Sequence, residues 1–215
     1  MKKLIAFVLI VSAAAVACKE DGFEITVEGR IFDESLGGSL SSADVVISTQ
    51  TVNGGVFSST YSPLVSTVTD GSGNFSMEVT KINVPDYQIE ASRDQYFSRE
   101  ITINADDFQP GETYVRNMTL YAQADVTFHL QNTSPLNEFD EITIQNVVTD
   151  FDCTCCNNAE REFGGTDVDT SVTCSLYGES WLKYFVQVDK DTLQYNYLDS
   201  VFCPAFENTV VTIEY

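Results

Sequence analysis

The amino-acid sequence predicts an all-β protein made of two antiparallel β-sandwich domains. Apolar and polar residues alternate with a period of two in many short segments, as in strands that bury one face. Clusters of Gly, Asn, Asp and Ser separate these segments and favour tight turns. Long runs with helical periodicity are absent from the sequence. These observations together predict strands and turns from residue 23 to the end of the sequence.

The first domain is expected at residues 23–121. Phe23, Ile25 and Val27 alternate with polar residues and predict a first strand that extends to residues 31–32. Further strands are expected at 43–50, 64–69, 74–79, 87–92, 97–103 and 114–120. Residues 51–63 are expected to form a loop, because they contain Asn-Gly-Gly and end in a proline. Seven short strands with regular turns are typical of an antiparallel sandwich.

The segment Asp70-Gly71-Ser72-Gly73 has two interpretations. Asp70, Ser72 and Asn74 match the first three ligand positions of a calcium-binding EF-hand loop. That loop also needs Gly at its sixth and Glu at its twelfth position, where this chain has Phe75 and Lys81. A hairpin turn is therefore the prediction here.

The order of segments in this half is similar to that of a known family. "VEGRIFD", "SADVVIS", "STVTDGSGNFSMEV", "YQIEASRDQYFSREITI" and "MTL" follow one another as in the carboxypeptidase regulatory-like domain. Gln95 stands where that family usually has glycine, before Tyr96. The resemblance covers residues 23–121 and implies a transthyretin-like sandwich in a secreted protein. It implies no peptidase activity, since this accessory domain has no catalytic residues.

The second half, residues 122–215, is expected to be a smaller, cysteine-containing β-sandwich. Residues 121–125 form the expected junction, and alternation then resumes through Val126, Phe128 and Leu130. Other strands are expected at 141–148, 182–188, 193–198 and 209–215. The aromatic residues of "LKYFVQV" and "LQYNYL" are candidates for a glycan-binding or protein-binding surface, with core packing as the alternative for about half of them.

All cysteines after Cys18 lie in this half and are disulfide candidates, since exported proteins favour disulfides. Two bridges and one free thiol are expected, and the sequence leaves their connectivity open; a bond such as Cys174 to Cys203 is one option. Structural zinc usually needs a second Cys-x-x-Cys pair, and redox chemistry needs a helical βαβ setting, so both are weaker alternatives. The candidates are Cys153, Cys155, Cys156, Cys174 and Cys203.

Three Asp-x-Asp pairs follow, and each would place two carboxylates on one face of a strand. Calcium takes six to eight oxygen ligands, so one pair is insufficient, and solvated loop acids are the preferred interpretation. We expect no metal site and no cofactor. The pairs are Asp150 with Asp152, Asp167 with Asp169, and Asp189 with Asp191.

The sequence predicts no catalytic residues. His129 is the only histidine, and it is out of phase with Phe128 and Leu130, so it is expected to face solvent. Nucleophilic catalysis needs a base held by a third group, and the common nucleophile and metal motifs are absent. The remaining enzymatic alternative is a small accessory hydrolase, such as a glycosidase that uses two of the many acids.

The N-terminus has the layout of a secretory signal peptide over residues 1–17. Lys2 and Lys3 precede an apolar run that is shorter than the roughly 20 residues needed to span a bilayer. The end, Ala-Val-Ala before Cys18, resembles the lipobox of bacterial lipoproteins of the Bacteroidetes type. This resemblance implies acylation of Cys18 with palmitate-like chains. Residues 18–22 would form a lipidated linker, and the acids at Glu20 and Asp21 resemble signals for export to the cell surface.

The net charge of the chain limits the classes of partner that it can bind. The sequence has 32 acidic and 11 basic residues and a net charge of −21. Lys2 and Lys3 are among these basic residues and would be lost with the signal peptide. Nucleic acid is excluded as a partner, because its binding relies on Lys and Arg. We therefore expect a non-catalytic lipoprotein of the outer membrane that faces the cell surface. Its expected role is binding, adhesion or scaffolding, with the membrane held through the lipid anchor and a protein or a glycan as ligand.

Overall fold

The structure, a computed structural model, describes residues 22–53, 56–147 and 156–215. It confirms the all-β fold class. The strands of the N-terminal half are β1 (Glu24–Asp33), β2 (Asp44–Asn53), β3 (Val56–Val68), β4 (Asn74–Thr80), β5 (Asp86–Ser92), β6 (Tyr96–Phe97), β7 (Arg99–Asn104) and β8 (Thr113–Val115), with a short 3-10 helix η1 (Ala105–Asp107). The remaining strands are β9 (Met118–Gln131), β10 (Glu141–Val147), β11 (Arg161–Gly164), β12 (Asp169–Tyr177), β13 (Ser180–Lys190), β14 (Leu193–Cys203) and β15 (Asn208–Glu214).

The first sandwich packs a four-stranded sheet of order β3-β2-β5-β7 against β4, β1, β8 and the start of β9. Its fully buried residues come from alternate positions of these strands, such as Val27 of β1, Ile47 of β2 and Ile89 of β5. Asp33 is a buried acid in this core, and Tyr96 Oη donates a 2.7 Å hydrogen bond to its carboxylate. Burial and this carboxylate raise the pKa of Tyr96 to about 12.

The second sandwich has the four-stranded sheet β11-β10-β13-β14 on one side and β12, β9 and β15 on the other. Its core is a separate cluster of buried residues that includes Phe128, Ile142 and Val186. The rings of Phe128 and Tyr184 meet edge to face at 5.0 Å between centroids. Among the described residues, no helix is both long and apolar enough to cross a membrane.

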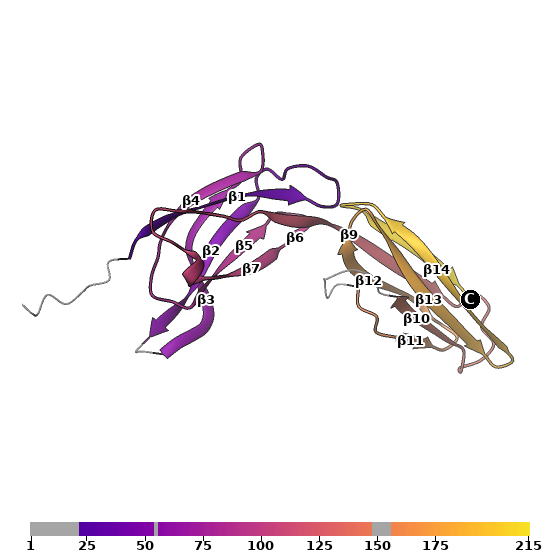
Figure 1. Ribbon diagram of the computed structural model, residues 1–215. Helices are drawn as coiled ribbons and strands as arrows, with labels where there is room; N and C mark the ends of the chain where they lie inside the picture. The colour runs from indigo at the N-terminus through magenta and orange to yellow at the C-terminus, as the bar shows by residue number, and fades with distance from the viewer. Residues whose placement is uncertain (1–21, 54–55, 148–155) are drawn as a thin grey trace, which may run out of the picture.

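Strand β9 belongs to both sandwiches (Figure 1). Every second side chain along it is buried: Leu120 and Ala122 lie in the first core, and Val126 and Phe128 lie in the second. The strand joins parts of both halves into one seven-stranded sheet. The two cores change over between Ala122 and Ala124, within the expected junction at residues 121–125. No loop separates them, because the alternation of buried and half-buried residues continues along β9.

Most pairings between the described strands are antiparallel, as expected, but three of them are parallel. β1 pairs in parallel with β8 and with β9, and β15 pairs in parallel with β9. The path of β1 passes very close to a neighbouring chain segment at Gly29. A Cβ atom there would lie 1.8 Å from the carbonyl oxygen of Arg116, so only glycine fits.

The structure corrects several local expectations. Residues 56–63 belong to β3, at the edge of its sheet, and Pro63 lies where the register with β2 shifts. The turn at Asp70 is not a hairpin, because β3 and β4 belong to different sheets. The expected strand at 97–103 is divided between β6 and β7, and β11 and β12 were not expected. The expected strand at 114–120 is likewise divided between β8 and the start of β9, and the other expected strands are present with bounds that differ by a few residues.

Candidate functional site

The outer face of the β13–β14 hairpin carries large exposed apolar side chains. The even-numbered residues of β13 from Leu182 to Lys190 are buried, so Trp181 and Phe185 point away from the core. Their cross-strand partners on β14 are Phe202 and Leu198. Trp181 is 60% exposed and Leu198 is 61% exposed, and the rings of Trp181 and Phe202 lie 5.5 Å apart between centroids. We call these four residues the apolar face of β13–β14.

This face adjoins a strand edge without a partner in the described part of the chain. β14 pairs with β13 only, so the backbone groups on its other side are open for pairing. Tyr195 and Tyr197 lie on the inner side of β14 and are still 38% and 36% exposed. Burial, Tyr195 and Asp199 raise the pKa of Tyr197 above its ordinary value. The hairpin therefore offers flat apolar rings and free main-chain groups, which suit a sugar ring or an extended peptide.

The two aromatic segments of the sequence have different environments. In "LKYFVQV", Leu182, Tyr184, Val186 and Val188 are core residues, and Phe185 is the one apolar side chain on the outer face. In "LQYNYL", the apolar and aromatic residues are all exposed. Trp181 and Phe202 were not predicted. The signal was present, since Trp181 is out of phase with the buried positions of its strand.

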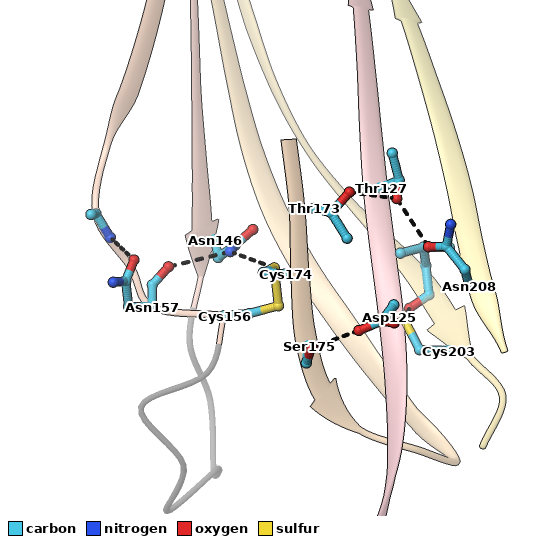
Figure 2. Close-up of a disulfide and its surroundings, with 12 residues drawn as sticks. Asp125, Thr127, Asn146, Cys156, Asn157, Thr173, Cys174, Ser175, Cys203 and Asn208 are labelled. Atoms are coloured by element: carbon cyan, nitrogen blue, oxygen red, sulfur yellow. Dashed lines mark hydrogen bonds between the residues drawn. A yellow bond between two sulfur atoms is a disulfide. The ribbon is translucent and has the colours of Figure 1, made fainter. Parts of the chain in front are cut away.

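Among the described residues, a disulfide joins Cys156 and Cys174 (Figure 2). Cys174 lies on β12, and Cys156 lies in the segment before β11, which Asn146 of β10 holds through a 3.2 Å hydrogen bond to the carbonyl of Asn157. The N–H of Cys156 also donates a 3.0 Å hydrogen bond to the carbonyl of Ser175 on β12. The disulfide therefore joins β12 to the segment that leads into β11. Disulfide formation by these two candidates matches the expectation for an exported protein.

The other cysteines differ from the expected scheme. The suggested bond between Cys174 and Cys203 is wrong, because Cys174 pairs with Cys156 and Cys203 is a buried free thiol. Burial raises the pKa of Cys203 to about 11, so it holds little reactive thiolate at neutral pH. Cys18, Cys153 and Cys155 lie outside the described residues.

His129 faces outward on β9, as predicted from its phase. Its Nδ1 lies 3.2 Å from Oγ of Ser171, and its Nε2 lies 3.6 Å from a carboxylate oxygen of Asp169. Both partners are on the neighbouring β12. Ser, His and Asp thus meet, but Asp169 is 61% exposed, whereas the acid of a catalytic triad is buried and fixes the histidine. The arrangement fits a hydrogen-bonded surface group on a sheet.

The acidic pairs are dispersed. Asp150 and Asp152 lie outside the described residues; Asp169 contacts His129, and Asp191 lies in the β13–β14 turn with a positive φ of 49°. Asp70 accepts 2.8 Å hydrogen bonds from the backbone N–H groups of Ser72 and Asn74, which lower its pKa. In the described ranges, no three His, Cys, Asp or Glu side chains are grouped to hold a metal ion.

No protein-family model and no curated protein matches this sequence. The carboxypeptidase regulatory-like assignment of residues 23–121 therefore stays a prediction. Solved structures with a similar arrangement include the Bacillus anthracis TIE protein, with 11% identity and a TM-score of 0.38. The match covers 89% of this chain and 34% of that protein's chain. The chain thus spans about a third of that protein. Another is the shaft pilin SpaA from Lactobacillus rhamnosus GG, with 8% identity and a TM-score of 0.37 over 89% of this chain and 98% of the pilin. A third is BcpA, the major pilin subunit of Bacillus cereus, with 9% identity and a TM-score of 0.30 over 84% of this chain and 69% of that one.

Proposed function

We propose that this protein is a non-catalytic, lipid-anchored scaffold or adhesion module of the cell surface. The observation that carries the proposal is the shared strand β9, which connects the two sandwiches without a loop. Its 14 residues span roughly 45 Å at the rise of an extended strand. A continuous strand transmits the orientation of one sandwich to the other, which is the property that a spacer needs.

Aromatic side chains support the strand where the sandwiches meet. The rings of Tyr121 and Tyr177 stack with 4.1 Å between centroids, and Phe97 contacts Tyr177 at 5.1 Å. On the other side, Tyr96 meets Phe206 at 5.4 Å. Each of these contacts joins a residue of the first half to one of the second, and each aromatic pair adds stabilisation of about 1 kcal/mol beyond its buried area.

Backbone hydrogen bonds fix the same region. The N–H of Gln123 donates to the carbonyl of Gln95 at 2.8 Å, and Gly178 N–H donates to Ala122 at 2.8 Å. Phe206 N–H donates to Gln123 at 2.6 Å. Domains joined by a small polar interface are expected to move relative to one another. Here a shared sheet, with backbone hydrogen bonds on both edges of β9, opposes that motion.

The direction of β1 supports an outward display. β1 begins at Glu24, pairs there with the end of β4, and reaches β9 only at its last residues. The N-terminal end of the first sandwich is thus opposite the second sandwich (Figure 1). A lipid on Cys18 would hold that end at the membrane and place the apolar face of β13–β14 away from it.

The rigid connection is tested by residual dipolar couplings on the full mature chain with Cys18→Ser. We expect amide couplings from both sandwiches to fit one alignment tensor. The Tyr177→Ala variant removes the ring contacts with Tyr121 and Phe97 at the junction and is expected to separate the two tensors. Tyr195→Ala, which is remote from the junction, should not. Two independent tensors in the unaltered chain would contradict a spacer.

The anchor and its side of the membrane need separate measurements. Radiolabelled palmitate should enter the protein and be lost with Cys18→Ser, which should also leave the membrane fraction. Protease treatment of intact cells should remove the domain together with a known surface protein. A domain that survives while that marker is lost belongs on the periplasmic side.

Binding and catalysis are separated by two assays on the same preparation. A glycan array and a peptide array test the apolar face of β13–β14, where Trp181→Ala should abolish binding and Trp181→Phe should retain part of it. Assays on polysaccharides and peptides test the accessory-hydrolase alternative. Turnover that is lost on substitution of His129, Ser171 or a single acid would overturn the non-catalytic assignment.

A further inference from the structure

A lysine is buried at the far end of the second sandwich. Lys190 is the last residue of β13 and is only 2% exposed, which is rare for a lysine. Its Nζ lies 2.7 Å from the side-chain oxygen of Asn132 and 3.0 Å from the carbonyl of Ser134. The ring of Tyr215 covers it, with 4.6 Å from Nζ to the ring centroid. The amine thus rests directly on an amide, in a site closed to water.

A buried carboxylate completes this cluster. Asp140 is 0% exposed, and its Oδ2 accepts a 3.0 Å hydrogen bond from the amide nitrogen of Asn132. The same oxygen lies 3.9 Å from Nζ of Lys190 and also accepts from the N–H of Leu136 at 2.8 Å. Burial raises the pKa of Asp140, but hydrogen bonds from Asn132, Leu136 and Asn137 outweigh this effect and the pKa lies below its ordinary value. The carboxylate is therefore ionised.

The positions of these atoms differ from those of an ordinary buried ion pair. In such a pair the ammonium would donate directly to the carboxylate, which compensates for the loss of water. Here the amide of Asn132 lies between them, with its oxygen toward Lys190 and its nitrogen toward Asp140. Nucleophile, carbonyl and proton carrier are thus in the order that acyl transfer requires.

We propose that Lys190 and Asn132 form an intramolecular amide bond between their side chains, with Asp140 as the proton carrier. Nζ first transfers a proton to the carboxylate of Asp140 and becomes a neutral amine. Its lone pair then forms a bond to Cγ of Asn132, and the Cγ–Nδ2 bond breaks. Nδ2 leaves as ammonia with a second proton from Nζ, and this ammonia takes the proton from Asp140 to become ammonium. The net reaction converts an ammonium and an amide into a secondary amide and ammonium, and needs no oxidant.

Two features of the fold favour this reaction. Fixed neighbours in a folded protein react as if at very high concentration, with effective molarities of about 10⁵ M or more in well-oriented cases. The amide is also held on both sides, because Nδ2 of Asn132 donates a 3.1 Å hydrogen bond to the carbonyl of Gly165 as well as to Asp140. The amine and the amide are therefore in hydrogen-bond contact as soon as the chain folds.

The bond would join the two sheets of the second sandwich. Asn132 directly follows β9, and Lys190 ends β13 on the opposite sheet. The disulfide lies nearer the first sandwich, where Cys174 pairs with Val126 of β9, and it joins β12 to the segment before β11. The amide bond would instead connect the two sheets directly at the far end.

Tryptic mapping of the full chain, purified from cells, reduced and alkylated, tests the proposal. Trypsin should release residues 117–161, which contain Asn132, joined to residues 184–215, which contain Lys190 and remain uncut after it. The joined species should be lighter than its two parts by one ammonia. Recovery of 117–161 and 184–190 as separate, unmodified peptides would overturn the proposal.

Variants identify the source of any lost ammonia. Lys190→Arg should abolish the joined species, and Asp140→Asn should reduce it to background although both bonding residues remain. Asp189→Asn, on the same strand but half-exposed, should leave it unchanged. Ammonia loss that persists in Lys190→Arg without a joined peptide would mean imide formation at an asparagine and would overturn the proposal. The mapping does not depend on lipidation or ligand binding, so its outcome is separate from that of the proposed function.

Discussion

Removal of the Cys156–Cys174 disulfide gives a quantitative test of how the second sandwich is stabilised. The perturbation is the double variant Cys156→Ala/Cys174→Ala, which deletes the bond without leaving an unpaired buried thiol. Both side chains belong to or pack against the second core, so the effect should be confined to that sandwich. Cys203→Ala, which removes the buried free thiol, is the matched control.

The expected magnitude follows from the loop that the bond closes. The two cysteines are 18 residues apart in the sequence. The chain-entropy model gives a loss of about 3 kcal/mol in the free energy of unfolding for a loop of this length. The unfolded chain also becomes less compact without the bond, so the denaturant dependence m should rise slightly.

Urea unfolding followed by far-UV circular dichroism measures this difference. We expect the double variant to lose about 3 kcal/mol and its Tm to fall by on the order of 10 °C. Dithiothreitol should destabilise the unaltered chain by a similar amount. A loss under about 1 kcal/mol in the double variant would refute the entropic reasoning, because it would mean that the bond does not constrain the unfolded chain.

Three further predictions concern the cores and the exposed face. Phe128→Ala should cost about 3–5 kcal/mol in urea unfolding, because the ring is 1% exposed and packs on Tyr184. The free energy of unfolding should fall as the pH rises from about 10 to about 12, because the pKa of Tyr96 and Tyr184 is about 12 in the folded chain and the unfolded chain loses these protons first. Tyr96→Phe should weaken this pH dependence. An unchanged profile in that variant would contradict the raised pKa of Tyr96. Trp181→Ala should change stability by less than about 0.5 kcal/mol, since the ring is exposed.

The strands that the sequence predicted are those with one strongly buried face. Ile25 and Val27 of β1 are 3% and 0% exposed, so their alternation with polar residues is clear. β12 was missed because its residues are mostly half-buried and its inward positions include Thr170 and Cys174, which weakens the apolar pattern. β3 was missed over residues 56–63 because Pro63 is normally a break, whereas an edge strand with a register shift tolerates it.

The buried cluster of the second sandwich was beyond prediction for a different reason. Asn132 and Asp140 are the first and last residues of the loop between β9 and β10, and Lys190 is the last residue of β13. Nothing in the spacing along the chain brings that strand end to this loop. Polar residues at strand ends usually face solvent, so each of them alone indicates a turn. Their burial depends on how the two sheets close at the far end, which is a property of the tertiary structure.

The single strand that runs through both cores also determines how the molecule responds to tension. A force applied between the N-terminal end of the first sandwich and the far end of the second acts along β1 and β9, which pair in parallel where they meet. The hydrogen bonds of β1 to β4 and β8 lie across that direction, so they are loaded in shear and must break together rather than one by one. A chain with a flexible linker would first extend at the linker, whereas this one has no slack between its two halves.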